Sequence, residues 1–388
     1  MDQLQKALKY IDSHEDELLK LWENMARIES QTADMAGVDK LAAHLDTYCT
    51  ALGLHTRKYS FEHAGPALAA WTEPGPLPPV ALMGHMDTVH PKGSFGPDAF
   101  QRDGDIVRGP GVYDCKGGIA VAFFVIRALI HAGYDARQLK LLLIGDEETA
   151  HGLSEGESLR LYREEARDCA AAFNCESGLL NGDVITCRKG GGVASMKFRG
   201  IASHAGVAPD KGASAIREAA HKILDIEALT DFNGTTFNCG TVSGGSGANV
   251  IPDSCQVNLS FRFHTNRDQE IALEKLRTIA ETVYVPGVTT ELILQAGFQA
   301  MEPTEKTDPL FELYRKASED LGFGSPNAVD SGGCSDGAYV AMEGVPVLCG
   351  VGVRGANNHS REEYAVVSSL KERAKIITKT ILDMPEDF

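Results

Sequence analysis

Histidine and acidic side chains repeatedly follow short apolar segments in this sequence. The clearest case is the stretch GHMDTVHPKG, residues 84–93, which comes directly after the apolar run Val80–Met83. Similar positions recur after later apolar runs, and Asp114 lies in a loop before an apolar helix. The residues placed in this way are His85, Asp87, Asp114, Glu147, Glu148, Glu176 and His359. Residues of these types can ligate metal ions or move protons.

The elements expected around these residues would bring them together. In an open α/β sheet the carboxyl ends of the parallel strands face one crevice, where such folds bind ligands. Several carboxylates in one cleft raise one another's pKa unless cations neutralise them, and a mixed imidazole and carboxylate set suits zinc, with cobalt or manganese as substitutes. If one carboxylate bridges, the set suffices for two ions. The predicted ligands are His85, Asp114, Glu148, Glu176 and His359.

The other members of the set are expected to assist these ligands. Side chains two residues apart on an extended segment point the same way, so Asp87 can accept the free ring N–H of His85 and fix its tautomer. The neighbouring Glu147 and Glu148 point in different directions, so one can ligate while the other takes a proton from water. His90 needs no catalytic role in this interpretation.

Each feature also has a structural alternative when it is taken alone. His85 and Asp87 could form a polar strand exit, the Glu-Glu pair could lie on the surface, and Asp114 could cap the helix that follows it. The ordered set, with ligand-type residues at four or five separate strand ends, is what favours a metal site. A different motif, GVGVRG at 350–355, matches the dinucleotide fingerprint, but only 33 residues follow it, too few for the helix and further strand of that fold.

Composition and charge limit the classes of function. Of the 388 residues, 43% are hydrophobic and 23% charged, which is globular composition with two domains as the working expectation. The net charge of −17 and the lack of a Lys/Arg block argue against nucleic acid and membrane as partners. The longest apolar run, Ile119–Ile126, is far shorter than the roughly 20 residues that span a bilayer. Nine cysteines without paired spacing fit neither a disulfide framework nor a zinc knuckle, so we expect a cytoplasmic protein.

The chain is predicted to form an α/β domain with a second domain inserted into it. After an amphipathic helix at about Leu4–Ala26, strand and helix patterns alternate as in a covered, largely parallel sheet. Residues 190–300 differ, because their patterns follow the ferredoxin-like order βαββαβ. Alternation in this part places Arg262 and His264 on the open face of one strand. The predicted ranges are 1–189 and 301–388 for the catalytic domain and 190–300 for the inserted domain.

These motifs carry a resemblance to a known family. The series GHMDTV, GPGVYDCKGG, GDEE, NCESG, GIASHAG, ANVIPD and NNHS resembles the M20 metallopeptidases, especially the glutamate carboxypeptidase and acetylornithine deacetylase branch. The likeness runs from about residue 80 to 360. It implies a mainly parallel α/β catalytic domain with two zinc ions per subunit, and an inserted lid domain that usually mediates formation of a homodimer.

The resemblance also implies a role for each site residue. His85 would ligate one ion and His359 the other, with Asp114 bridging and Glu148 and Glu176 completing the two sites. Glu147 would be the general base, Asp87 would orient His85, and His204 of the lid would stabilise the oxyanion. A cis peptide is expected between Asp114 and Cys115. Asp336, in GGCSDG, is expected to brace a loop near the site.

Three further positions indicate the substrate class through the same resemblance. Carboxypeptidase-like and deacylase members tend to have Glu at the position of Glu176, where aminopeptidase-like members have Asp. Arg262 and Asn249 match positions expected to hold a free carboxylate, although Arg262 could also be an exposed strand arginine. The function predicted is hydrolysis of a peptide or N-acyl amide bond beside a free amino-acid carboxylate. The alternatives are a deacylase of the acetylornithine or succinyl-diaminopimelate type, a di- or tripeptidase, and a metal-binding scaffold without activity.

Overall fold

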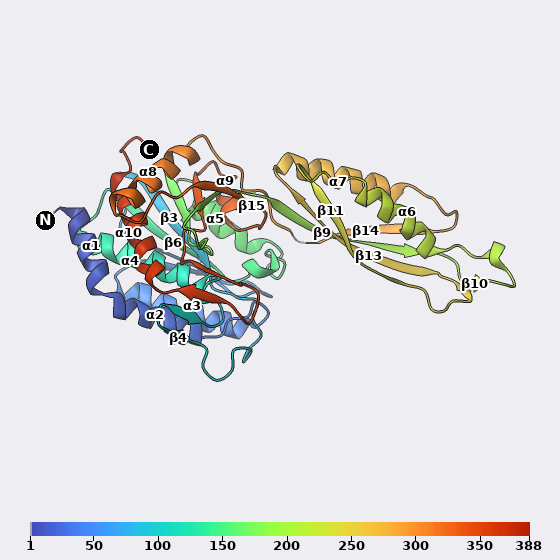
Figure 1. Cartoon of the computed structure of the whole chain (residues 1–388), viewed down its shortest axis with the longest axis horizontal. Coiled ribbons are helices and arrows are strands. Elements are labelled where there is room, and N and C mark those ends of the chain that lie inside the picture. The colour runs from blue at the N-terminus through green and yellow to red at the C-terminus, as the bar shows by residue number, and fades with distance from the viewer. Residues whose placement is uncertain (1, 296) are drawn as a thin grey trace. The chain divides into compact units, whose positions relative to one another are not determined.

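The computed structural model describes residues 2–295 and 297–388, which divide into two compact units (Figure 1). Unit 1 comprises Met1–Cys187, Met301–Ser331 and Ser335–Phe388, and unit 2 comprises Arg188–Ala300 and Gly332–Cys334. The short segment Gly332–Cys334 falls within the range predicted for the catalytic domain. It groups with unit 2 because Arg188 donates hydrogen bonds to the carbonyls of Gly333 and Cys334.

An eight-stranded sheet forms the centre of unit 1, in the order β1-β2-β6-β3-β7-β16-β8-β15. The parallel central strands are β6 (Arg137–Ile144), β3 (Leu77–His85), β7 (Ala171–Asn174) and β16 (Val347–Cys349). The remaining strands are β1 (His55–Tyr59), β2 (Ala67–Trp71), β8 (Val184–Arg188) and β15 (Ala328–Ser331). The pairs β1–β2, β2–β6 and β16–β8 are antiparallel. The mixed α/β fold with a large, mainly parallel sheet confirms the predicted fold class.

Helices pack around this sheet, and the most deeply buried is α4 (Lys116–Ala132). It contacts β3 and also α1 (Gln3–Ser13), α2 (Glu15–Arg27) and α10 (Ser368–Asp383). The other helices of unit 1 are α3 (Met35–Ala51), α5 (Arg160–Glu165), α8 (Thr307–Asp320) and α9 (Gly337–Ala341). No helix among the described residues is both long and apolar enough to cross a bilayer.

The single helix predicted at Leu4–Ala26 is wrong, because two helices meet there at His14. The side chain of Ser13 bonds back to the carbonyl of Lys9, while the second helix begins with Glu15, Asp16 and Glu17. Three acidic residues in one first turn favour a helix N-terminus through the helix dipole. The apolar spacing continues across the break, which explains why the spacing alone did not reveal it.

A second, smaller sheet in unit 1 places two loops that matter below. Its order is β17-β18-β5-β4. The strands are β17 (Gly355–Ala356), β18 (Tyr364–Val366), β5 (Ile106–Arg108) and β4 (Gln101–Asp103). The hairpin β17–β18 carries residues 357–363 in its loop, and the chain from β5 continues into the loop before α4.

Unit 2 is built on a four-stranded antiparallel sheet in the order β11-β13-β9-β14. In chain order its main elements are β9 (Gly190–Arg199), α6 (Ala215–Glu227), β11 (Thr236–Gly244), β13 (Ser254–Phe263), α7 (Asn266–Glu281) and β14 (Thr289–Leu294). This is the βαββαβ order that the sequence predicts. Alternate residues of β13 are buried in the core of unit 2, while Arg262 is exposed. A short additional pair, β10 (Ser203–His204) and β12 (Val250–Ile251), lies outside this sheet.

Candidate functional site

The ends of three adjacent parallel strands supply most of the site. His85 is the last residue of β3, and Glu147 begins a short 3-10 turn after β6. Glu176 follows β7, separated from it by Cys175. Asp114 lies just before α4. His359 comes from the loop between β17 and β18, with a backbone φ of 61°.

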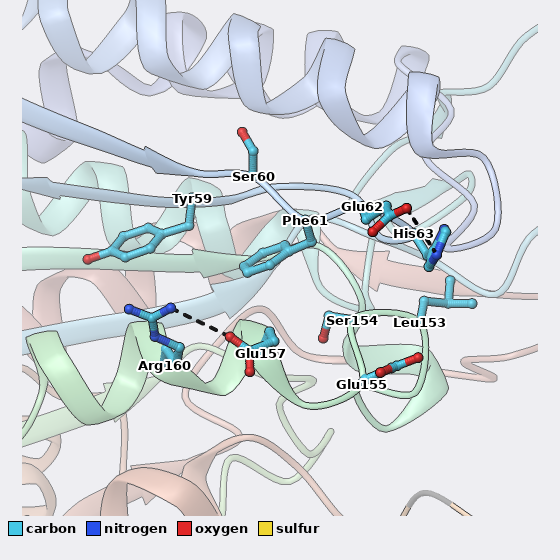
Figure 2. Close-up of a pocket in the computed structure, with 10 residues that line it drawn as sticks. All are labelled: Tyr59, Ser60, Phe61, Glu62, His63, Leu153, Ser154, Glu155, Glu157 and Arg160. Carbon is cyan, nitrogen blue, oxygen red and sulfur yellow. Dashed lines mark ion pairs between the residues drawn. The ribbon is translucent and has the colours of Figure 1, made fainter.

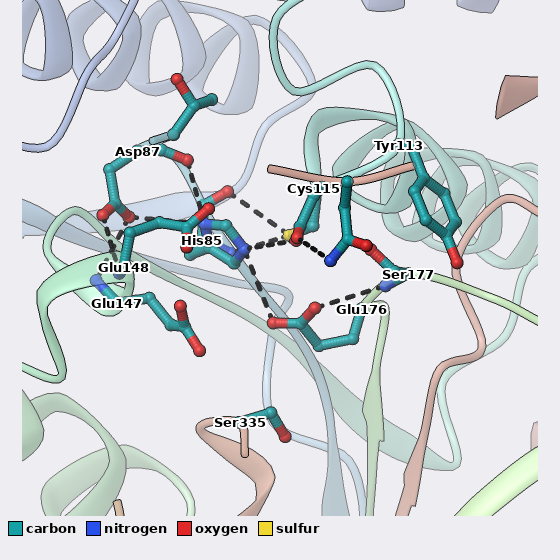
Figure 3. Close-up of polar contacts among 12 residues, drawn as sticks. His85, Asp87, Tyr113, Cys115, Glu147, Glu148, Glu176, Ser177 and Ser335 are labelled. Carbon is teal, nitrogen blue, oxygen red and sulfur yellow. Dashed lines mark hydrogen bonds and ion pairs between the residues drawn. The ribbon is translucent and has the colours of Figure 1, made fainter. Parts of the chain in front are cut away.

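Asp114 lies between the two histidines. Its Oδ1 is 3.1 Å from Nε2 of His85, and its Oδ2 is 3.4 Å from Nε2 of His359. Glu176 Oε1 lies 3.5 Å from the same nitrogen of His85, and its carboxylate points toward that ring in Figure 3. Glu148 Oε2 lies 3.1 Å from Nε2 of His359. The five residues predicted as ligands therefore lie together, in two clusters joined by one carboxylate.

The atoms of this cluster are of the kinds that can ligate a metal ion. Imidazole and carboxylate atoms of His85, Asp114 and Glu148 all lie within 4.8 Å of one another. Glu148 Oε1 is buried and has no hydrogen-bond partner among the described residues. Such an acceptor is costly to bury without a partner. A divalent cation would satisfy it, so the residues present fit the metal that their types predict.

Asp87 differs in one detail from the prediction. The closest oxygen to His85 Nδ1 is the backbone carbonyl of Asp87 at 3.0 Å, while carboxylate Oδ1 is 3.4 Å away. The carboxylate instead accepts hydrogen bonds from the backbone N–H groups of Glu147 and Glu148, at 3.3 and 3.1 Å. Thr32 donates a third bond, at 2.8 Å. Asp87 thus holds the paired glutamates as well as the His85 ring.

The charges of the cluster shift the pKa values of its members in opposite directions. Burial would lower the pKa of His85, but the surrounding carboxylates, Glu176 foremost, raise it well above its usual value. Burial would raise the pKa of Asp114, and the hydrogen bonds from both histidines hold it well below its usual value. Hydrogen bonds to Asp114 and Glu148 raise the pKa of His359 to about 10. The histidines thus stabilise the anionic carboxylates.

Glu147 has a raised pKa, as does its neighbour Glu148, and it is the further of the two from its usual value. Its pKa is raised well above the usual value, first because it is buried and then because Glu176 and Asp336 lie nearby. Burial also raises the pKa of Glu148. A carboxyl group with a raised pKa is suited to take up and release a proton near neutral pH.

Cys115 lies beside the ligands without replacing them. The Asp114–Cys115 peptide is cis, as the resemblance implied. The thiol accepts a hydrogen bond from the backbone N–H of His85 at 3.1 Å, and burial raises its pKa to about 12. A neutral, buried thiol is a poor nucleophile, so its position favours packing over catalysis.

The three residues predicted to bind the substrate or its oxyanion belong to unit 2 and are exposed. They are His204, Asn249 and Arg262. Pairing of β10 with β12 and a bond from Ala205 N–H to the Asn249 carbonyl bring His204 and Asn249 onto adjacent segments. His204 Nδ1 accepts a bond from Gly206 N–H at 3.2 Å, which leaves Nε2 as the protonated ring nitrogen of neutral histidine. Arg262 Nη1 donates to Cys334 Sγ at 3.3 Å.

The sequence did not identify Asn358 or His151 as residues of the site. Asn358 donates to Asp114 Oδ2 at 2.9 Å, and only its place beside His359 could have indicated it. Asp336 accepts bonds from His151 Nε2 at 2.7 Å and from the Tyr162 hydroxyl at 2.8 Å. His151 also lies 3.4 Å from Asp146, directly before the paired glutamates. The brace predicted for Asp336 therefore acts through a buried histidine.

A separate pocket of about 380 Å³ in unit 1 contains none of these residues (Figure 2). It is lined by the chain after β1 and by the turns before α5. Two close contacts lie in its lining, Arg160 to Glu157 at 3.5 Å and His63 to Glu62 at 3.7 Å. The pocket is therefore distinct from the cluster around Asp114.

The chain is similar in sequence to known proteins. The model of peptidase family M20/M25/M40 matches residues 81–383. Carboxypeptidase G2 from Pseudomonas sp. (strain RS-16) is 30% identical over 380 residues, which cover 95% of this chain and 89% of that protein. A succinyl-diaminopimelate desuccinylase from Hydrogenovibrio crunogenus is 25% identical, over 95% of this chain and 99% of the relative.

A solved structure shares the fold at much lower identity. The M20 family metallo-carboxypeptidase Sso-CP2 from Sulfolobus solfataricus has a TM-score of 0.76 with 15% identity, over 94% of this chain and 98% of that one.

Proposed function

This chain belongs to peptidase family M20/M25/M40, and from that premise we propose that it hydrolyses a peptide or N-acyl amide bond beside a free amino-acid carboxylate, using two zinc ions. The observation that carries the proposal is Asp114, whose two oxygens face one histidine each. One ion would be held by His85 and Glu176, the other by His359 and Glu148, with Asp114 shared.

When bound, such ions polarise the substrate carbonyl and make water nucleophilic near neutral pH. The chain supplies the proton transfer. The Glu147 carboxylate accepts a proton from the attacking water and later donates it to the nitrogen of the leaving amine, so that one amide and one water yield a carboxylic acid and an amine, which ionise to a carboxylate and an ammonium group. Its raised pKa supports this role.

Residues of unit 2 would bind the rest of the substrate. The Nε2–H of His204 would donate a hydrogen bond to the oxyanion, in its own chain or across a dimer. Arg262, exposed on the open face of β13, and the Asn249 side chain would hold the free carboxylate of the substrate. The name of the relative that is 30% identical, a carboxypeptidase, supports this substrate class.

A substrate panel tests the proposal. The protein, treated with chelator and then reloaded with zinc or cobalt, is assayed with dipeptides, N-acyl amino acids and the matching C-terminal amides. We expect hydrolysis only after reloading, and only of compounds with a free carboxylate. No hydrolysis of either class, or equal hydrolysis of the amides, would contradict the proposal.

A deacylase is the second candidate, favoured by the desuccinylase relative. The same panel separates the two, because a deacylase would cleave N-acetyl or N-succinyl amino acids faster than dipeptides.

A homodimer formed through unit 2 and a cytoplasmic location complete the proposal. Unit 2 has exposed apolar side chains on and near α6 and β11, including Leu224 (70% exposed), Phe232 (88%) and Val242 (60%), and β11 is an edge strand. Exposed apolar surface beside an open sheet edge is typical of a protein interface. All nine cysteines are free thiols, as expected in a reducing compartment.

A further inference from the structure

Glu363 is a fully buried acidic residue that the proposed mechanism does not use. It lies four residues after His359, just before β18. A buried carboxylate is costly unless it is well hydrogen bonded, so its partners show what it does.

One oxygen of Glu363 holds the backbone next to the shared ligand. Oε1 accepts hydrogen bonds from the N–H groups of Tyr113 and Asp114, at 2.9 and 3.1 Å. The Asp114 side chain extends from this same residue, and both of its oxygens face histidines. A shift of this backbone would therefore move both oxygens of the shared carboxylate together.

The other oxygen of Glu363 contacts His90. The distance from Oε2 to His90 Nε2 is 2.5 Å, and the His90 ring is packed edge-on against Phe95. His90 is only 6% exposed. His90 therefore makes a specific contact in the interior, which is separate from the question of a catalytic role.

We propose that Glu363 and His90 form a positioning pair that fixes the backbone at Asp114 and so determines how tightly the metal ions are held. One carboxylate therefore connects the loop after β3, which contains His90 and follows His85, with the loops that carry Asp114 and His359. The inference rests on the proposed function, since it concerns the same two ions.

A matched control exists in unit 2. Glu218 is also buried, accepts hydrogen bonds from two consecutive backbone N–H groups, those of Tyr284 and Val285, and pairs with the cation of Lys222. It offers the same type of bonding without contact to any proposed ligand. Glu218→Ala therefore shows how far zinc affinity changes when a buried, hydrogen-bonded glutamate is removed away from the proposed ligands.

The experiment compares zinc affinity among purified full-length variants, by competition with a chelating dye, together with the absorption spectrum of the cobalt-loaded proteins. Glu363→Ala is expected to weaken zinc binding by about 10- to 100-fold, the range for residues that support metal ligands. His90→Phe, which keeps packing against Phe95, is expected to fall near the lower end of that range. Glu363→Gln, which retains an oxygen acceptor, is expected to restore most of the affinity, and Glu218→Ala to match wild type.

The outcomes distinguish this inference from the proposed function. Wild-type protein that binds two ions, together with unchanged zinc affinity and cobalt spectra in Glu363→Ala and His90→Phe, would overturn the inference alone. So would an equal loss in Glu218→Ala. If Glu363→Ala does not fold, His90→Phe decides the question. Wild-type protein that binds no zinc or cobalt would overturn both.

Discussion

At the scale of single residues, the types and order of the side chains predicted which groups lie together. His85 and Glu176 are far apart in the chain, yet His85 ends β3 and Glu176 follows the neighbouring parallel strand β7, so their meeting followed from the topology. The supporting residues could not be found in this way. His90 and Glu363 are 273 positions apart, and their contact depends on the conformations of two loops rather than on any repeated pattern.

Glu147 offers the most direct test at this scale. Glu147→Gln keeps the size of the side chain and removes its ability to accept a proton, so kcat is expected to fall by about 10²- to 10⁴-fold. Zinc content, measured by atomic absorption, is expected to stay at the wild-type value because Glu147 is not a proposed ligand. Glu155→Gln, an exposed glutamate on the same loop, is the control and keeps full activity. Loss of zinc in Glu147→Gln would contradict this assignment and indicate that Glu147 is the ligand and Glu148 the general base.

Protonation of His151 is expected to make the stability of the folded state depend on pH. Its surroundings, Asp336 foremost, raise its pKa to about 10 despite burial, compared with 6.5 in a free side chain. The folded state therefore binds a proton that the unfolded state releases between these values, and the stabilisation is complete below pH 6.5 and lost as the pH rises through 10.

The comparison of variants isolates this effect. In urea unfolding of metal-free protein, the loss of stability in His151→Gln is expected to be largest near pH 6 and to diminish toward pH 10. Wild-type protein unfolded at the same pH values is the reference for each loss. A loss of constant size at every pH would assign His151 a packing role only.

At the scale of elements, periodicity predicted the main strands of both units, but it missed β8 and β15 and did not show where one helix ends and the next begins. Alternation along β13 gave the face on which Arg262 lies, because its register with β9 is regular over the whole strand. The break at His14 leaves the apolar spacing intact, so periodicity could not locate it.

Gly191 on β9 tests the substrate role of Arg262. It pairs with Arg262, and a Cβ at Gly191 would lie 1.6 Å from Arg262 Nη1. Gly191→Ala therefore has to displace the guanidinium, and we expect KM for a carboxylate substrate to rise about tenfold or more, as for loss of a charge-assisted bond, with kcat changed less. Gly332→Ala is the control, since a Cβ there meets nothing within 4 Å. Unchanged KM in Gly191→Ala would leave Arg262 as an exposed strand arginine.

At the scale of the whole molecule, the insertion of one unit into the other followed from the change of pattern near residue 190 and its reversal near 300. The sequence did not indicate that segment 332–334 groups with unit 2, because its place depends on hydrogen bonds from Arg188 rather than on its own sequence.

The dimer is a prediction at this scale. Light scattering of wild-type protein is expected to give twice the chain mass of 41.7 kDa. Val242→Lys places a charge on the edge strand β11 and is expected to give the mass of a single chain. Val283→Lys is a matched control, 62% exposed in unit 2 but outside the strands. A fully active single chain in the wild type would contradict the dimer and a role of His204 across subunits.

The discontinuity of unit 1 has a consequence for biosynthesis. Every helix and strand of unit 2 is complete by residue 294, whereas unit 1 still lacks β16, a central parallel strand of its sheet, as well as the loop with His359 and Glu363. A ribosome therefore releases these segments of unit 1 after the helices and strands of unit 2. The nascent chain carries His85, Asp114, Glu148 and Glu176 before unit 2 is made, and it can add His359 to the proposed metal site only afterwards.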